Sequence, residues 1–184
     1  MTPPGFDIRR LTYADLPQVI AIERRAFPTP WSLAMFVLEL SKPSGICLAA
    51  WHRPAIAGGD GEPRERICGY LICSKYDTVW HVMNVSVDPD VRRQHVATSL
   101  INGLLERVDD PLGQYTLEVR PSNGGAIAMY ERFSFITAGM RRRYYQDNGE
   151  DALIMWRTPS TLQGRLDDVP NAWPVPPTSS MPRT

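Results

Sequence analysis

The chain has 184 residues, of which 43% are hydrophobic and 22% are charged. This length and composition fit one compact domain with its own core and argue against a second full domain. The 20 basic residues balance the 20 acidic residues, so net charge provides no long-range attraction to nucleic acid or to an anionic membrane.

The sequence also lacks the features of a secreted, membrane-bound or metal-binding protein. Residues 1–7 have neither the charged start nor the apolar stretch of a secretory signal, and no long apolar run follows. The three cysteines, Cys47, Cys68 and Cys73, have no Cys-x-x-Cys or histidine spacing around them, so we expect buried thiols. We predict a cytoplasmic protein with no metal site and no membrane partner.

The first half of the chain predicts a strand, two helices and three further strands. Phe6–Leu11 has the pattern of a strand, and Thr12-Tyr-Ala-Asp15 resembles a capping box that opens a helix extending toward Phe27. Ser32 is placed to cap a second helix. The three strands that follow are Ile46–Trp51, Ile67–Ser74 and His81–Val87, with a flexible loop at 52–66 and a hairpin turn near 75–79.

The second half of the chain predicts alternating helices and strands. Apolar residues from Val96 to Val108 recur with helical spacing, which is the strongest helix signal in the sequence. The remaining predicted elements are a strand at Tyr115–Arg120, a helix at Asn123–Arg132 capped by Asn123, and strands at Phe135–Met140 and Ala152–Trp156. The expected fold class is α/β, a mixed seven-stranded sheet flanked by helices.

The last 26 residues, Pro159–Thr184, contain six prolines and no periodic apolar pattern. A segment of this composition buries too little apolar surface to offset the entropy of ordering it. We therefore predict one folded domain over residues 1–158 and a mostly disordered tail over residues 159–184.

The segment from Val85 to Thr98 carries the most chemistry. It consists of a predicted strand, a tight turn and the first turn of the helix that begins at Val96. Amides at a helix start have no intrahelical partner and carry partial positive charge, and Arg92 and Arg93 add full charges beside them. Such a turn can bind a pyrophosphate. Taken alone, the segment leaves open a simple basic turn before a structural helix.

This turn resembles the acetyl-coenzyme A signature of the GNAT superfamily of acetyltransferases. The signature is Gln/Arg-x-x-Gly-x-Gly/Ala at a strand-to-helix turn, and the chain has Arg92-Arg-Gln-His-Val-Ala97, which matches its first and last positions. His95 stands where the family has glycine, a residue that lets the backbone approach a phosphate closely. His95 fits this turn if its backbone dihedrals are ordinary and its ring points outward, where it could also contact a phosphate, and we keep the match.

The resemblance sharpens to the RimI-type protein N-terminal alanine acetyltransferases over roughly Phe6–Arg157. The matching pieces, in chain order, are Pro30–Ser32, Val85–Pro89, Leu117–Asn123, Ala126–Glu131, Arg141–Tyr145 and Glu150–Met155. The resemblance implies the GNAT fold, in which the seven-stranded sheet is mostly antiparallel. It also implies transfer of an acetyl group from acetyl-CoA to the N-terminal α-amine of a protein, such as a ribosomal protein.

The same resemblance implies which residues form the site. Glu118 corresponds to the catalytic base and Tyr130 to the catalytic acid. The implied acetyl-CoA-binding residues are Val85, Ser86, Val87, Arg92, Arg93, Gln94, His95, Val96, Ala97, Thr98 and Asn123.

The residue pattern favours these catalytic roles independently of the family. Leu117 and Val119 point to one face of their strand and Glu118 to the other, where its carboxylate can take a proton from an ammonium. Tyr130 follows Asn123 by seven residues, about two helical turns, so one helix presents two groups to one ligand. A phenol with a pKa near 10 can protonate a departing thiolate. A solvated carboxylate and a core tyrosine are the alternatives.

The resemblance implies that the loop after residues 141–145 helps to form the acceptor groove, so we expect the acceptor peptide near two aromatic segments, Phe27–Trp31 and Tyr144–Asp147. The second follows the basic run Arg141–Arg143, a combination that also occurs in nucleic-acid sites, although we expect no direct contact with nucleic acid. The alternative functions are acetylation of a small amine or a lysine side chain, and non-catalytic binding of acyl-CoA. The intact Glu118 and Tyr130 favour an enzyme, and the aromatic segments favour a protein acceptor.

Overall fold

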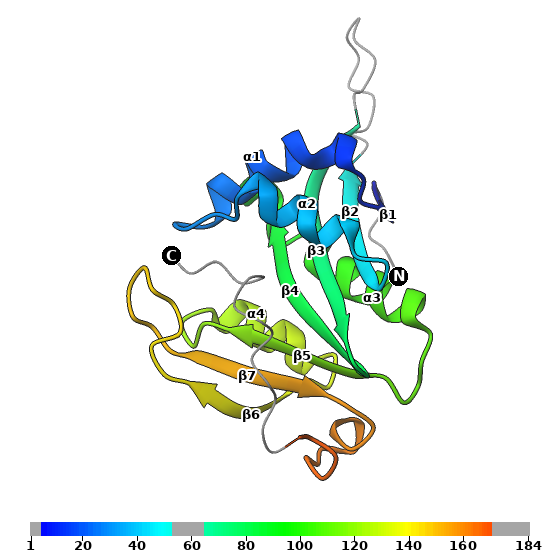
Figure 1. Cartoon of the computed structure of the whole chain (residues 1–184), viewed down its shortest axis with the longest axis vertical. Helices are drawn as coiled ribbons and strands as arrows, with labels where there is room; N and C mark the ends of the chain where they lie inside the picture. Colours follow the sequence, from blue (N-terminus) through cyan, green and yellow to red (C-terminus); the bar gives the residue numbers. More distant parts are fainter. Residues whose placement is uncertain (1–4, 53–64, 171–184) are drawn as a thin grey trace, which may run out of the picture. The chain divides into compact units, whose positions relative to one another are not determined.

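The computed structural model describes residues 5–52 and 65–170 (Figure 1). Its strands pair in the order β1-β2-β3-β4-β5-β7-β6. The pairs β1/β2, β5/β7 and β6/β7 are antiparallel, whereas β4/β5 is parallel. The predicted mixed, mostly antiparallel seven-stranded sheet with four α-helices is therefore confirmed.

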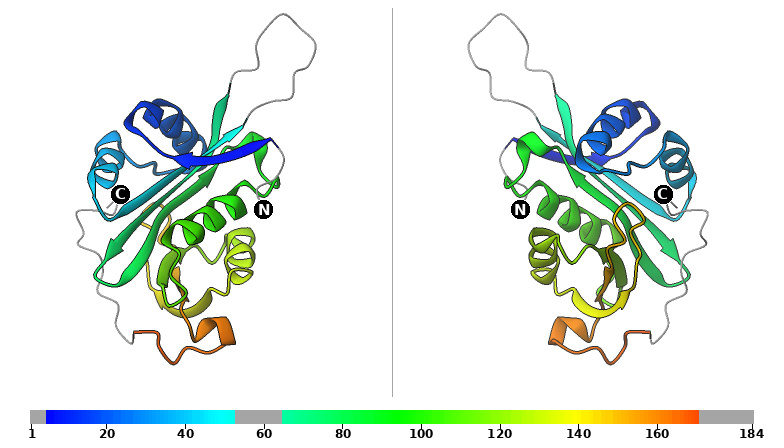
Figure 2. Two further views of the ribbon diagram at one scale, coloured as in Figure 1. Left: turned by 90° about the vertical axis from the view of Figure 1, so that its right-hand side faces the viewer. Right: turned by 90° about the vertical axis from the view of Figure 1, so that its left-hand side faces the viewer.

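The chain forms two compact units, and the first contains the residues up to Cys73 together with Asn84–Asp109. Helices α1 and α2 lie on one face of its strands and α3 lies on the other (Figure 2). Its elements are β1 (Phe6–Arg10), a 3-10 turn (Tyr13–Asp15), α1 (Leu16–Ala26), α2 (Leu33–Ser41), β2 (Gly45–His52), most of β3 (Arg66–Tyr76), the end of β4 (Val79–Val87), a second 3-10 turn (Pro89–Val91) and α3 (Val96–Val108).

Neither of the two N-terminal helices begins with a side-chain capping bond. The predicted capping box is present, with the Thr12 backbone N–H donating to the Asp15 carboxylate at 2.8 Å, but it opens the 3-10 turn Tyr13–Asp15. Helix α1 itself begins after Asp15 without a side-chain cap. Ser32 does occupy the N-cap position of α2, but its side chain makes no capping hydrogen bond. The prediction that Ser32 occupies the N-cap is therefore confirmed, but the capping hydrogen bond from its side chain is not formed.

Helix α3 supplies a large part of the first unit's core. Leu100, Ile101 and Leu104 on its inner face are at most 1% exposed, and the helix packs against β1 and β2. Its start lies against Gly69 of β3, where an added Cβ would come 2.9 Å from the Ser86 carbonyl oxygen and 3.0 Å from Val96 Cγ1. The absence of a side chain at Gly69 thus allows the close approach of strand and helix.

The second unit contains Ser74–Met83 and the residues from Asp110 onward. Helix α4 lies on one face of strands β5, β7 and β6 (Figure 1). The elements here are the end of β3, the start of β4, β5 (Gln114–Val119), α4 (Gly124–Glu131), β6 (Ile136–Arg141), β7 (Ala152–Arg157) and a 3-10 turn (Thr161–Gln163). The β3/β4 hairpin is tighter than predicted, since Asp77 and Thr78 alone separate the two strands and Asp77 has a φ of 54°.

The predicted loop at 52–66 and the predicted tail at 159–184 lie partly outside the residues that the structure describes. The parts outside are residues 53–64 and residues 171–184. Residues 159–170, which the sequence places in the disordered tail, instead form a hydrogen-bonded turn in which the Asp168 carboxylate accepts from the Ser160 backbone N–H at 3.0 Å and from the Thr158 hydroxyl. Three polar side chains close this turn without a periodic apolar pattern, which explains why sequence periodicity missed it.

The cysteines are buried free thiols, as predicted. Burial raises the pKa of Cys47 and of Cys68 to about 11, which keeps both thiols protonated at neutral pH. Among the described residues, no three His, Cys, Asp or Glu side chains gather as metal ligands would. Within the same ranges, every helix is too short or too polar to span a lipid bilayer.

Substitution of Gly69 tests the close packing at the start of α3. We expect Gly69→Ala to lower the free energy of unfolding by about 1–3 kcal/mol, because the new methyl group overlaps a backbone oxygen and Val96. The matched control is Gly125→Ala in α4, where an added Cβ meets nothing within 4 Å. Urea unfolding should show the control unchanged or stabilised by up to about 1 kcal/mol, and equal losses in both variants would contradict this packing.

Candidate active site

The predicted phosphate-binding turn joins β4 to α3 within the first unit. The side chains of Arg92, Arg93, Gln94 and His95 are exposed, and α3 has no side-chain cap at its N-terminus. Its first intrahelical bond runs from the Ser99 N–H to the His95 carbonyl oxygen at 3.0 Å. The amides of Val96, Ala97 and Thr98 therefore precede the intrahelical ladder. An uncapped helix start beside two exposed arginines fits the oxygens of a phosphate group.

The backbone of His95 does not have the ordinary dihedrals on which its fit to this turn was conditioned. His95 is left-handed, with φ 59° and ψ 16°, and Arg93 also has a positive φ of 65°. The reason is that the chain must reverse sharply to enter α3, which glycine does without strain and an L-residue does at a cost. The exposed position of His95 agrees with an outward ring.

Asp88 anchors the same turn to the rest of the first unit. Its buried carboxylate accepts hydrogen bonds from Arg25 at 3.0 Å and from Arg66 at 3.1 Å. The Asp90 backbone N–H also donates to it at 3.0 Å. Just before this anchor, the side chains of Val85 and Val87 are half-buried and that of Ser86 is buried, as alternation along β4 requires.

Glu118 lies at the centre of the second unit's polar site. Its side chain is only 4% exposed, so the solvated alternative does not apply. One carboxylate oxygen lies 2.6 Å from His81 Nε2, and the other accepts from Arg141 Nε at 3.1 Å. Burial alone would raise the pKa of Glu118, but the His81 hydrogen bond and the Arg141 charge outweigh it and hold the pKa below its ordinary value. The group is therefore a buried carboxylate that stays ionised.

His81 and Arg141 were not among the predicted site residues. His81 belongs to β4, which pairs in parallel with β5 so that His81 lies opposite Thr116, two residues before Glu118. Because the carboxylate is ionised, His81 Nε2 must be the donor, while its Nδ1 is buried with no partner among the described residues. The only signal in the sequence was that His81 is a polar residue within an apolar strand. That signal does not reveal how β4 and β5 are aligned.

Tyr130 and Asn123 lie on α4 as predicted. Asn123 is the N-cap, and its side-chain oxygen accepts from the Ala126 N–H at 3.2 Å. Tyr130 is 7% exposed and its ring packs edge-on against Phe135 at 5.6 Å between centroids. Burial raises the pKa of Tyr130 well above its usual value. Its phenol therefore keeps its proton at neutral pH, as an acid must before it donates.

Each of the two aromatic segments is held by an acidic or basic side chain that the sequence did not single out. In the first unit, the buried carboxylate of Glu23 accepts from the Trp31 backbone N–H at 2.8 Å and from the Tyr70 hydroxyl. Burial raises the pKa of Glu23. In the second unit, the Arg120 guanidinium carbon lies 3.7 Å from the centroid of the Tyr145 ring, which packs edge-on against Tyr144.

The structure thus divides the predicted site residues between its two units. Glu118, Tyr130 and Asn123 belong to the second unit. Those of the first unit are Val85, Ser86 and Val87 in β4, and Arg92, Arg93, Gln94, His95, Val96, Ala97 and Thr98 in the turn and α3.

The first unit thus contains an uncapped, basic strand-to-helix turn, and the second contains a buried carboxylate and a protonated tyrosine. The sequence profile of the acetyltransferase (GNAT) family matches residues 16–135. The chain belongs to the acetyltransferase (GNAT) family.

Several individual proteins are similar to this chain in sequence or in structure. The ribosomal protein bS18-alanine N-acetyltransferase of Escherichia coli is 31% identical over 159 residues, which covers 80% of this chain and 94% of that protein. The N-alpha-acetyltransferase RimI of Mycobacterium tuberculosis is 32% identical over 152 residues, which covers 82% of this chain and 90% of that protein. The crystal structure of the E. coli ribosomal-protein-S18-alanine N-acetyltransferase superposes with a TM-score of 0.70 at 30% identity, covering 83% of this chain and 93% of that one.

The left-handed conformation of His95 predicts the effect of a glycine there. His95→Gly should raise the free energy of unfolding by up to about 1 kcal/mol, because glycine adopts a positive φ without strain. The control is Gln94→Gly at the neighbouring exposed position, whose φ is not positive; it should lower stability by about 0.4–1 kcal/mol. Thermal and urea unfolding measure both variants, and destabilisation by His95→Gly would show that the imidazole itself holds the turn.

Proposed function

We propose that this chain transfers an acetyl group from acetyl-CoA to the N-terminal α-amine of a protein, with a ribosomal protein of the bS18 type as the first candidate. The observation that supports this acceptor most directly is the 31% identity to a bS18-alanine N-acetyltransferase across 94% of that protein's length. Residues 1–158 act as the catalytic domain in this proposal. A ribosomal-protein acceptor agrees with a cytoplasmic enzyme that contacts neither a membrane nor nucleic acid.

The coenzyme side of the proposal rests on the turn before α3. The thioester of acetyl-CoA supplies the acetyl group. The amides at the start of α3 bind the pyrophosphate, and Arg92 and Arg93 neutralise its charge. Asn123 binds the coenzyme from the start of α4. A backbone amide of Val85–Val87 stabilises the negative charge that develops on the acetyl oxygen.

The acid and base of the proposal are Tyr130 and Glu118. Glu118 accepts a proton from the acceptor amine, directly or through water. Among residues 5–52 and 65–170, His81 and Arg141 each meet one of its oxygens, and a carboxylate oxygen can accept a second bond. Tyr130 donates its phenol proton to the departing thiolate sulfur. The raised pKa of Tyr130 keeps that proton in place until the sulfur becomes negative.

The lowered pKa of Glu118 favours an α-amine over a lysine side chain. A weakly basic carboxylate cannot easily remove a proton from an ammonium with a high pKa. At pH 7 about 10% of a protein's α-amine is neutral, against less than about 0.1% of a lysine side chain. An enzyme with this weak base therefore acts fastest on an acceptor amine of which a sizeable fraction is already neutral at pH 7.

A peptide panel tests the acceptor. We expect acetylation of a bS18-type peptide that begins with alanine, with mass spectrometry placing the acetyl group on the α-amine. The matched controls are the same sequence with a blocked N-terminus and an internal lysine, and a small amine such as spermidine. Preferential modification of the lysine or the small amine would overturn the proposed acceptor. Coenzyme binding without any transfer would make the chain a binding module.

Substitution of the base and the acid tests the chemistry. Glu118→Gln should lower kcat on the order of 10²- to 10⁴-fold, and Tyr130→Phe should lower kcat with little change in the KM of the acceptor peptide. Wild-type kcat/KM should rise with pH as the acceptor amine loses its proton, and the Gln variant should recover part of its deficit at high pH.

Folding must be measured alongside activity, because Glu118→Gln leaves Arg141 without its counter-charge. Circular dichroism and acetyl-CoA binding by calorimetry show whether each variant retains its fold and its coenzyme site. Folded, coenzyme-binding variants with wild-type rates across the pH range would show that neither residue is catalytic.

A further inference from the structure

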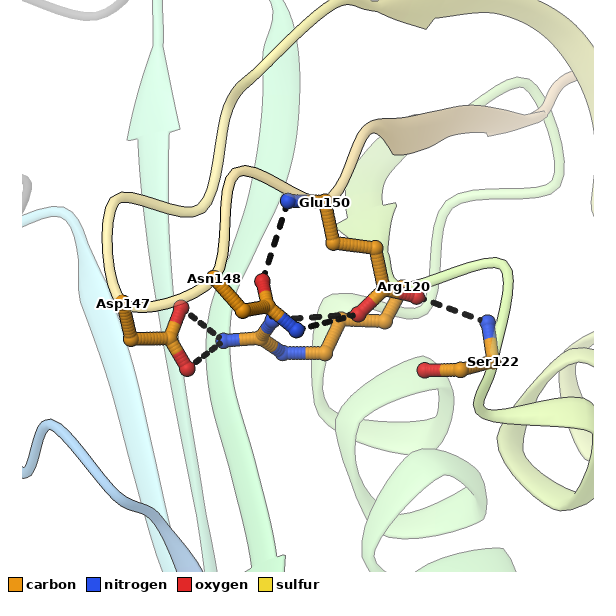
Figure 3. Close-up of polar contacts among 5 residues, drawn as sticks. All are labelled: Arg120, Ser122, Asp147, Asn148 and Glu150. Carbon is orange, nitrogen blue, oxygen red and sulfur yellow. Dashed lines mark hydrogen bonds and ion pairs between the residues drawn. The ribbon is translucent and has the colours of Figure 1, made fainter.

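A cluster of polar side chains surrounds Arg120, directly after β5 (Figure 3). Arg120 Nη2 donates to both carboxylate oxygens of Asp147, at 2.8 and 2.9 Å. Its Nη1 donates to Asn148 Oδ1 at 3.0 Å and to Glu150 Oε2 at 3.1 Å. The side chains of Arg120, Asp147 and Glu150 are only 15–20% exposed. One guanidinium thus binds three polar side chains of the segment between β6 and β7.

This segment, residues 142–151, is here called the β6–β7 loop, and its own hydrogen bonds complete the arrangement. The Tyr145 N–H donates to the Glu150 carbonyl oxygen at 3.0 Å, and the Gly149 N–H donates to the Tyr145 carbonyl oxygen at 2.7 Å. Gly149 has a φ of 70°, which suits glycine. The loop therefore has a defined fold around the Arg120 side chain.

Glu150 connects the loop to the start of α4. Its second carboxylate oxygen accepts from the Ser122 backbone N–H at 2.9 Å (Figure 3). These bonds to Ser122 and Arg120 lower the pKa of Glu150 to about 2, so the carboxylate is charged at any pH at which the enzyme would work. Ser122 immediately precedes Asn123, the N-cap of the helix that carries Tyr130.

The loop also begins beside the base, because Arg141, the residue before the loop, donates to the Glu118 carboxylate at 3.1 Å. Arg120 stacks on Tyr145, which packs against Tyr144 at 5.1 Å between ring centroids. Burial, followed by the charge of Glu118, raises the pKa of Tyr144. The chain of contacts from Arg120 through Tyr145 to Tyr144 therefore ends within electrostatic reach of the carboxylate proposed to deprotonate the acceptor.

We propose that Arg120 is a positioning residue that holds the β6–β7 loop as a preformed wall of the acceptor site. This inference rests on the proposed function, since it takes the loop beside Glu118 as the place where the acceptor peptide lies. Arg120 does not touch the reacting atoms. It fixes Tyr144 and Tyr145 before the peptide binds. The binding free energy of the peptide is then not reduced by an entropic cost of ordering the loop.

The arrangement requires the shape of arginine as well as its charge. A planar guanidinium can bind Asp147 through one nitrogen and Glu150 through another while its face lies on Tyr145. A lysine ammonium at the same place is a point charge without a fork or a flat face. Arg120→Lys therefore keeps the net charge of the cluster and removes its geometry, which separates positioning from simple electrostatic attraction.

The test compares Arg120→Lys with Arg132→Lys, the same change at an exposed arginine at the end of α4. Two readouts are needed, namely steady-state kinetics with whichever acceptor the wild type prefers, and hydrogen–deuterium exchange of the amides in residues 142–151. We expect Arg120→Lys to raise the KM of the acceptor about 10- to 100-fold, to leave the KM of acetyl-CoA within about two-fold, and to speed exchange in the loop. Arg132→Lys should change none of these.

Different outcomes point to different failures. Faster loop exchange with an unchanged acceptor KM would show that the loop is not part of the acceptor site, and it would overturn the inference. Unchanged loop exchange would show that Arg120 does not hold the loop, with the same consequence. Equal increases in the KM of both substrates would indicate a general structural role. A wild type that prefers lysine to an α-amine would overturn the proposed function, while the Arg120 comparison could still be made with that acceptor.

Discussion

A charged carboxylate buried in the sheet is the constraint on which the second unit depends. Glu118 cannot remain ionised away from water unless donors reach both of its oxygens. Those donors come from β4 and β6, so the parallel pairing of β4 with β5 and the antiparallel pairing of β7 with its two neighbours must all form. Loss of one partner of a buried pair costs about 3–5 kcal/mol, and the fold is therefore tied to the charge at its proposed catalytic centre.

This arrangement also limits the chemistry. The bonds that keep Glu118 ionised make it a weaker base, because the same His81 and Arg141 contacts that stabilise the anion oppose its protonation. Proton transfer from any ammonium to this carboxylate is then uphill, and it is least uphill from an amine whose own pKa lies near neutrality. A protein α-amine meets this condition and a lysine side chain does not. The buried network and the proposed acceptor are consistent with each other for a physical reason.

Each of three irregular segments is held by one acidic or basic side chain. Asp88 holds the turn before α3, Glu23 holds the backbone at Trp31, and Arg120 holds the β6–β7 loop. Loops have few backbone partners of their own, so a charged side chain that binds several groups at once can fix a conformation that local propensity does not favour. The left-handed residues Arg93 and His95 lie in the first of these segments, after the Asp88 anchor.

The sequence by itself determined the features that depend on neighbours along the chain. Its apolar period placed α3 at Val96–Val108 residue for residue, and Asn123 was recognised as the cap of α4. Only the tertiary structure brought His81 to Glu118, 37 residues away, and Asp147 to Arg120, 27 residues away. Periodicity and capping report local hydrogen bonds and one-sided burial, whereas these pairs depend on strand register and on the path of a loop. The left-handed backbone of His95 likewise follows from the direction in which the chain must enter α3, which no side chain in the turn specifies.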